Sequence, residues 1–205
     1  MNNDLRFKNT KNNQVLDFIA TWVSRIFSPL LMIPLFILMI VHFSTTSAQL
    51  YISLFGFGIF GVLPILGFLI LLKKLGMISD WGVNIRRERY VLNAVGLICS
   101  LLLLWVFRST AAWDVIGILF WIIVTHVVFT LFTYLIKVSA HTASITLICL
   151  LLSLYLNRQL EWLFLLVPLV IWSRTYLQKH SLLEAGLGIM VGLTPLFLLY
   201  LLNYI

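Results

Sequence analysis

The sequence predicts an all-α fold, a polytopic transmembrane helical bundle, and both composition and hydropathy lead to that class. Of the 205 residues, 61% are hydrophobic and only 10% are charged, and the mean hydropathy is +1.05. Because a spanning helix needs about 20 apolar residues, six to seven spans nearly use up the chain. No separate soluble domain fits beside them.

The chain divides into an N-terminal part, residues 1–26, and a single transmembrane domain, residues 27–205. The first dozen residues are polar and Asn-rich, and they lack the apolar core and small-residue cleavage site of a secretory signal. This composition predicts a polar tail that is retained in the protein. The segment 15–27 has apolar residues at helical spacing together with Asp17 and Arg25, which indicates an interfacial lead-in helix or an extension of the first span.

Seven apolar runs in the transmembrane domain are the predicted spans. Five prolines lie within these runs and predict kinks, because neighbouring helices can compensate the lost backbone hydrogen bonds. Cys99 and Cys149 lie in apolar runs without a CxxC or His-rich neighbour, so neither a disulfide nor a metal site is expected. The runs cover approximately residues 27–44, 50–72, 91–107, 112–136, 142–157, 160–176 and 181–203.

Basic residues are distributed unevenly over the two sides that seven spans would define. All but two of the 14 Lys and Arg lie in the N-terminal part or in the loops after the second, fourth and sixth spans. The opposite side has only Arg108 and Arg158. By the positive-inside rule, the N-terminus and those loops face the cytoplasm of an inner or plasma membrane. The net charge of +7 fits this asymmetry, and no nucleic-acid partner is expected.

Polar chemistry is concentrated in three breaks between spans, and the strongest signal is in the third break. If His180 and Glu184 begin a helix, their spacing places them on one face, roughly 6 Å apart. The carboxylate would then hold the imidazole in one tautomer and leave the other nitrogen free to attack. Arg174 offers a planar fork of donors suited to phosphate oxygens. Alternatively, Arg174 and Lys179 are interfacial snorkelling residues with Glu184 as their ion-pair partner.

The second break places Ser139, His141 and Thr142 at the start of a predicted span. Ser139 or Thr142 would cap the helix, whose free N–H groups suit an anion. His141 would lie in the first turn, where it can give a proton to a leaving oxygen. The same residues are also consistent with a plain helix cap beside an interfacial histidine.

The first break contains three arginines within four residues, Arg86, Arg87 and Arg89, beside Asp80 and Glu88. They fit a phosphate cradle braced by carboxylates, or ordinary cytoplasmic anchors for anionic headgroups. Because the three breaks fall on the same predicted side, they can build one site, and that combination favours phosphate binding.

With the three breaks in this order, the chain resembles the type 2 phosphatidic acid phosphatase superfamily, which includes lipid phosphate and prenyl diphosphate phosphatases. That family has a Lys separated by six residues from Arg-Pro, then Pro-Ser-Gly-His, then Ser-Arg-x5-His-x3-Asp. The third motif is matched in spacing by Ser173, Arg174 and His180, with Glu184 in place of Asp.

The other two motifs are matched less closely. Ser139 and His141 match the second motif, while valine and alanine replace its Pro and Gly. In the first motif, Arg89 is followed by tyrosine and the Lys position holds glycine, so Arg86 or Arg87 would have to supply the missing charge.

The resemblance implies a six-helix phosphatase core and a two-step hydrolysis that uses no metal or other cofactor. His180 would attack phosphorus, Glu184 would orient it, and His141 would protonate the departing lipid oxygen. Water would then cleave the phosphohistidine. Fixed donors around the developing charge are the main requirement of phosphoryl transfer. The donors would be Arg89, Arg174, Ser139 and Ser173.

The implied substrate is a lipid phosphate, either phosphatidate-like or a polyprenyl phosphate or diphosphate, whose tail stays in the membrane. One alternative is a non-catalytic lipid-binding membrane protein of the same fold, which the departures from the three motifs favour. Another is a small transporter, although the chain lacks an inverted repeat or paired broken helices. His42 and His126 fit no motif and are expected to pack or hydrogen-bond between helices.

Overall fold

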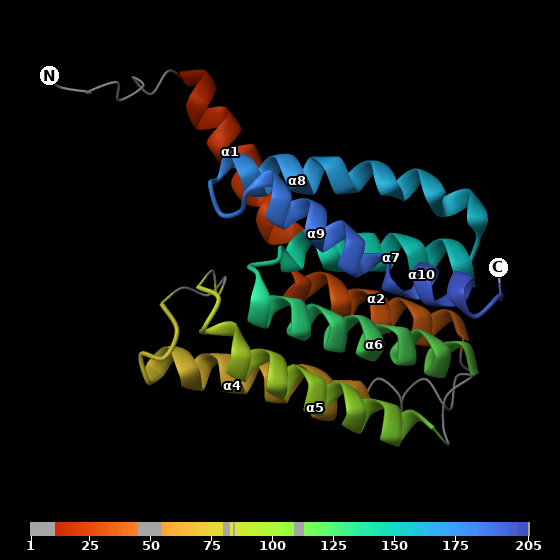
Figure 1. Cartoon of the computed structure of the whole chain (residues 1–205). Coiled ribbons are helices and arrows are strands. Elements are labelled where there is room, and N and C mark those ends of the chain that lie inside the picture. Colours follow the sequence, from red (N-terminus) through yellow and green to blue (C-terminus); the bar gives the residue numbers. More distant parts are fainter. Residues whose placement is uncertain (1–10, 45–54, 80–82, 84, 109–112, 205) are drawn as a thin grey trace, which may run out of the picture.

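The computed structural model describes residues 11–44, 55–79, 83, 85–108 and 113–204, and all regular secondary structure within these ranges is helical (Figure 1). The all-α class is therefore confirmed. The expected tail at residues 1–10 lies outside the described residues. The helices are α1 (Lys11–Ile26), α2 (Pro29–Ser44), the π-helical turn η1 (Gly58–Val62), α4 (Leu63–Lys74), α5 (Arg89–Phe107), α6 (Trp113–Leu135), α7 (Ala140–Tyr155), the 3₁₀ segment η2 (Arg158–Leu165), α8 (Leu166–Tyr176), α9 (Leu182–Gly192) and α10 (Thr194–Leu201).

Several of these helices can cross a membrane. In the described part of the chain, Phe55–Lys74, α5 and α6 are each long and apolar enough to span, and two bent pairs raise the number to five if each pair is one span. The pairs are α1 with α2, bent by 48°, and α9 with α10, bent by 47°. These helices indicate a membrane protein. The larger number of six to seven spans stays a prediction, because α7 and α8 have only 16 and 11 residues.

Prolines explain where the bent pairs break. Pro29 is the first residue of α2 and Pro195 is the second residue of α10. Proline lacks a backbone N–H, so it cannot continue a preceding helix but fits the first turn of a new one, where that N–H would have no partner within the helix. It therefore ends one helix and opens the next, which places the expected kinks at these two positions.

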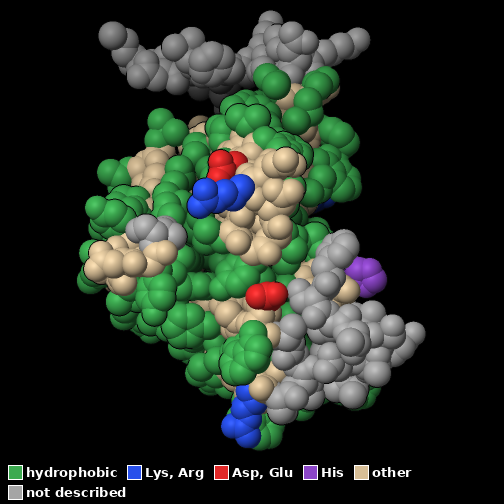
Figure 2. Space-filling view, turned by 90° about the vertical axis from the view of Figure 1, so that its right-hand side faces the viewer, with side chains coloured by type: hydrophobic (Ala, Val, Ile, Leu, Met, Phe, Trp, Pro, Cys, Tyr) green, Lys and Arg blue, Asp and Glu red, His purple; other side chains and the backbone are tan. Residues whose placement is uncertain are grey.

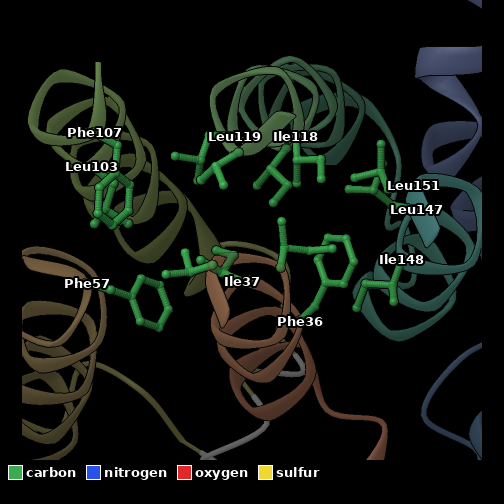
Figure 3. Packing of buried hydrophobic residues seen from close by; sticks show 14 of the residues in the cluster. Phe36, Ile37, Phe57, Leu103, Phe107, Ile118, Leu119, Leu147, Ile148 and Leu151 are labelled. Atoms are coloured by element: carbon green, nitrogen blue, oxygen red, sulfur yellow. The ribbon is translucent and has the colours of Figure 1, made fainter. Parts of the chain in front are cut away.

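The apolar core lies between α2, α5, α6 and α7, together with the segment before η1 (Figure 3). Within a bilayer, lipid tails are as apolar as the core side chains, so close van der Waals packing holds the helices together. The labelled side chains point toward one another from all of these elements. They are Phe36, Ile37, Phe57, Leu103, Phe107, Ile118, Leu119, Leu147, Ile148 and Leu151.

Helix α7 is the most buried helix, and two glycines bring α9 close to it. A Cβ atom on Gly188 would lie 2.7 Å from the Ser139 carbonyl oxygen, and one on Gly192 would lie 2.6 Å from the Ala143 carbonyl oxygen. Small residues four apart allow this kind of close helix approach. As a result, the Ser139 N–H donates to the Glu184 carbonyl at 3.1 Å, and the starts of α7 and α9 meet.

The two ends of the bundle differ in charge. The loops before α5, α7 and α9 lie together at the left-hand end in Figure 1. Figure 2 looks at the opposite end, where a few isolated charged side chains interrupt a mainly hydrophobic surface. Arg108 caps the end of α5 and Arg158 opens η2, and both helix ends lie there. This distribution agrees with the charge asymmetry of the sequence, while the cytoplasmic orientation stays a prediction.

Candidate functional site

The three polar breaks are joined by direct hydrogen bonds at one end of the bundle. Arg89 from the first break donates through NH1 to the Val138 carbonyl of the second at 2.7 Å. Lys137 from the second break donates through Nζ to the Lys179 carbonyl of the third at 2.9 Å. Together with the contact between Ser139 and Glu184, these bonds bring residues up to about a hundred positions apart into one site.

His180 and Glu184 form the closest side-chain pair of the site. The distance between His180 Nδ1 and Glu184 Oε2 is 2.7 Å, and the imidazole is fully buried. An ionised carboxylate can only accept, so Nδ1 carries the proton and Nε2 keeps its lone pair. Nε2 is buried and has no hydrogen-bond partner. The pair therefore presents one oriented, unprotonated ring nitrogen.

The local backbone explains why this pair is so close. Helix α9 begins only after Ser181, whose hydroxyl accepts from the Glu184 N–H while the Glu184 carboxylate accepts from the Ser181 N–H. This capping box turns the carboxylate back toward His180, which precedes the helix. Gln178 has a φ of 53°, a left-handed conformation that ends α8 and reverses the chain. The sequence predicted both residues within one helix and missed the cap.

The electrostatic environment keeps the His180 imidazole neutral. The pKa of His180 is lowered from 6.5 to about 3, chiefly by burial and in addition by the positive charges of Arg174, Arg89 and Lys137. Lys137 Nζ also lies 3.6 Å from Glu184 Oε2. A buried neutral imidazole next to three cations is suited to nucleophilic attack on an anion.

Arg89 and Arg174 are both buried, and both line a cavity that lies inside the bundle next to the three breaks. Arg89 donates through Nε to the Val83 carbonyl at 2.8 Å as well as to Val138, so its guanidinium is fixed by two backbone oxygens. Val83 has a φ of 44°, which is strained for a β-branched residue. Arg174 donates through NH1 to the Ser24 hydroxyl at 2.6 Å.

The second break supplies a cap and a histidine, as the sequence predicted. Ser139 is fully buried, and its hydroxyl accepts from the Thr142 N–H at the start of α7. His141 Nε2 lies 3.1 Å from the Ser24 carbonyl oxygen. Because that oxygen can only accept, Nε2 carries the proton of the His141 ring. His141 lines the cavity with Arg89 and Arg174.

Helix α1 takes part in the site, which the sequence did not indicate. Besides the two contacts of Ser24, Ser173 donates its hydroxyl to the Ala20 carbonyl at 2.7 Å. Ala20 and Ser24 are buried, while Phe18 and Trp22 on the same helix are exposed. The sequence does contain a pattern that could have indicated this contact, since two small residues four positions apart lie among large side chains. Small residues at this spacing allow α1 to pack closely on α8.

The remaining arginines of the first break lie away from the cavity. Arg86 is half-buried and donates through NH1 to the Leu135 carbonyl at 2.9 Å. Arg87 is exposed and borders a separate small pocket with Glu88. Neither lines the cavity beside Arg89, so the structure does not bring them together with the other candidate residues. Lys179 lines that cavity instead. Two residues of the break, Asp80 and Gly82, lie outside the described residues.

A cavity of about 790 Å³ extends from these polar groups into the bundle. Arg89, His141 and Arg174 line its polar part, and its deeper walls are apolar, with Ile37 and Leu119 among them. His180 does not line the cavity, since its ring is enclosed. Ligand sites commonly combine such an apolar volume with a few converging polar groups.

Among the described residues, no three His, Cys, Asp or Glu side chains are grouped so that they could hold a metal ion. In comparisons with known proteins, no family model, no curated protein and no solved structure matches this chain.

Proposed function

We propose that this protein is a multi-pass membrane lipid phosphatase that hydrolyses a phosphomonoester or diphosphate of a lipid through a phosphohistidine intermediate. The observation that carries the proposal is the pair of the buried His180 and the half-buried Glu184, held beside the buried guanidinium groups of Arg89 and Arg174. The type 2 phosphatidic acid phosphatase pattern of the sequence supports the same chemistry.

In the first step, the lone pair of His180 Nε2 attacks phosphorus, and the bond from phosphorus to the lipid oxygen breaks. Glu184 accepts the Nδ1 proton in a hydrogen bond and stabilises the positive charge that develops on the ring. His141 gives its proton to the departing lipid oxygen, and the dianionic phosphate favours a protonated His141 before this step. In the second step, His141 takes a proton from water, which attacks phosphorus and releases phosphate from His180.

The two buried arginines stabilise the charge on the phosphoryl oxygens. Charged donors in a site sheltered from water act more strongly than the same groups in solution. Arg89 is already fixed by the carbonyls of Val83 and Val138, so it needs little reorganisation when the phosphate arrives. On Arg174, a phosphate oxygen would take the place of the Ser24 hydroxyl.

The apolar part of the cavity supports an amphiphilic substrate, since a hydrocarbon tail can fill it while the phosphate stays near the arginines. The proposal includes seven spans, with the N-terminus and the three breaks at the cytoplasmic face.

One observation favours a second candidate function, a lipid-binding protein of the same fold without catalysis. His180 Nε2 is closed off from the cavity, and Ser173, Arg174 and His141 are engaged by α1. For catalysis, α1 must shift so that the phosphate can reach Nε2. If α1 stays in place, the cavity can still bind a lipid.

The test is phosphate release by detergent-purified protein from phosphatidate, phosphatidylglycerophosphate and prenyl phosphates and diphosphates, with EDTA present. We expect release by the wild type and by the control His42→Ala, and none by His180→Ala. Quenching in alkali during turnover of a ³²P-labelled lipid should trap an acid-labile protein label that His180→Ala lacks. If the protein binds lipids of the panel but releases phosphate from none of them, the result would favour the non-catalytic function.

A further inference from the structure

We infer that the cavity contains a second polar subsite, formed by Asn93 on α5 and Thr125 on α6, that binds an ester or amide carbonyl of the lipid. The inference rests on the proposed function for the position of the phosphate. It narrows the substrate to lipids that carry a hydrogen-bond acceptor near the phosphate, and it disfavours chains that are pure hydrocarbon.

Asn93 and Thr125 line the cavity and have unsatisfied polar groups. Asn93 Nδ2 and Thr125 Oγ1 are buried and have no hydrogen-bond partner, and Thr125 is only 4% exposed. Leaving a buried donor unpaired costs free energy, so such groups call for a partner. Asn93 Nδ2 can only donate and the Thr125 hydroxyl can also donate, so a partner that serves both is an acceptor.

Two other hydroxyl groups that line the same cavity are satisfied within their own helices. The Ser100 hydroxyl donates to the Gly96 carbonyl at 2.8 Å, and the Ser144 hydroxyl donates to the His141 carbonyl at 3.1 Å. The hydroxyl of Thr125 makes no such bond. Among the hydroxyl and side-chain amide groups of the described residues that line the cavity, the buried atoms without a partner are those of Asn93 and Thr125.

These two residues lie near a point where α5 and α6 approach each other closely. His126 packs against Gly96, where an added Cβ would lie 2.8 Å from the imidazole Cε1. Asn93 is nearly one turn before Gly96 on α5, and Thr125 is next to His126 on α6. Both residues line the cavity near the same helix contact, so we expect a single lipid segment to reach both.

The position along α5 matches the chemistry of an acylated glycerol phosphate. Arg89 and Asn93 are four residues apart, so they share a helix face with a rise of roughly 6 Å between them. In a diacylglycerol phosphate, a few bonds separate the phosphate from an ester carbonyl, which can span this rise. In a prenyl phosphate, the same position holds only hydrocarbon and would leave both donors unpaired.

The experiment compares 1,2-diacylglycerol 3-phosphate with its 1,2-dialkyl ether analogue of equal chain length, which differs only in lacking the carbonyls. Both kcat/KM and Kd are measured on the detergent-purified full chain. We expect the wild type to prefer the ester about tenfold, as two modest hydrogen bonds would give. Thr125→Val, which is close in shape, and Asn93→Leu should each lower that preference to about threefold or less.

Thr130→Val is the matched control. Thr130 is also on α6 and its hydroxyl also has no partner, but it does not line the cavity. The ester preference should survive in this variant. Equal binding and turnover of ester and ether by the wild type would overturn the subsite, even if phosphate is released from both. An ester preference in binding that Thr125→Val loses would support the subsite, even if no lipid is hydrolysed and the phosphatase proposal fails.

Discussion

The first and third polar breaks contain similar residue types and differ in what surrounds them. The first break has more charge, yet Arg86 is half-buried, Arg87 is exposed and the Glu88 carboxylate accepts hydrogen bonds from Ser79. In the third break, Arg174 and His180 are buried, and Glu184 pairs with the imidazole. Under the proposed function, burial, and not the number of charges, would separate the groups that act on a phosphate from groups solvated at the membrane surface.

The largest difference between the first and third breaks is expected when one carboxylate is changed in each of them. Glu184→Gln should lower kcat about 10⁴-fold, because loss of the carboxylate allows the wrong imidazole tautomer, as it does in a Ser-His-Asp triad. Glu88→Gln should leave kcat within twofold, because its carboxylate accepts hydrogen bonds from Ser79 and Glu88 borders a separate pocket. The measurement is lipid phosphate release by the two variants at equal folded concentration. Similar losses would show that the two carboxylates do not differ in role.

A second pair of variants tests two arginines that are only two residues apart. Arg89→Ala should lower kcat about 10²- to 10³-fold, the usual effect of removing one preorganised donor. Arg87→Ala should change kcat less than twofold, because Arg87 is exposed and borders a separate pocket. Initial rates on one lipid phosphate give both values. A large effect of Arg87→Ala would mean that the exposed arginine reaches the substrate.

The helices could be predicted from the sequence largely because apolar composition decides them. The run expected at residues 91–107 is α5, and the run at 112–136 is α6, with ends that differ by no more than two residues. The number of spans was harder to predict, since α7 and α8 are short. Length alone does not determine whether a short helix crosses the membrane.

The site could be predicted in part. Motif spacing identified Arg174, His180 and Glu184, because these residues lie within one short segment of the sequence. It did not identify Ser24, whose contacts with Arg174 and His141 depend on how α1 packs against a helix about 150 residues later in the chain. The resemblance assigned a phosphate-binding role to Arg89, but the sequence could not show that Arg86 and Arg87 lie away from the cavity, because that depends on tertiary packing.

The smallest expected effect concerns pH, and it tests the environment of His180 without requiring turnover. Because burial and three cations lower the His180 pKa to about 3, the ring should stay neutral from pH 7.5 to pH 5. Its ¹⁵N shifts should show a protonated Nδ1 and an unprotonated Nε2 across that range, with the signal assigned by its loss in His180→Ala. The unfolded imidazole takes up a proton near its ordinary pKa of 6.5 while the folded one does not, so lowering the pH through 6.5 favours unfolding. A titration midpoint near 6.5 in the folded protein would show that His180 is exposed to water. The third break would then not differ from the first in the burial of its key residue.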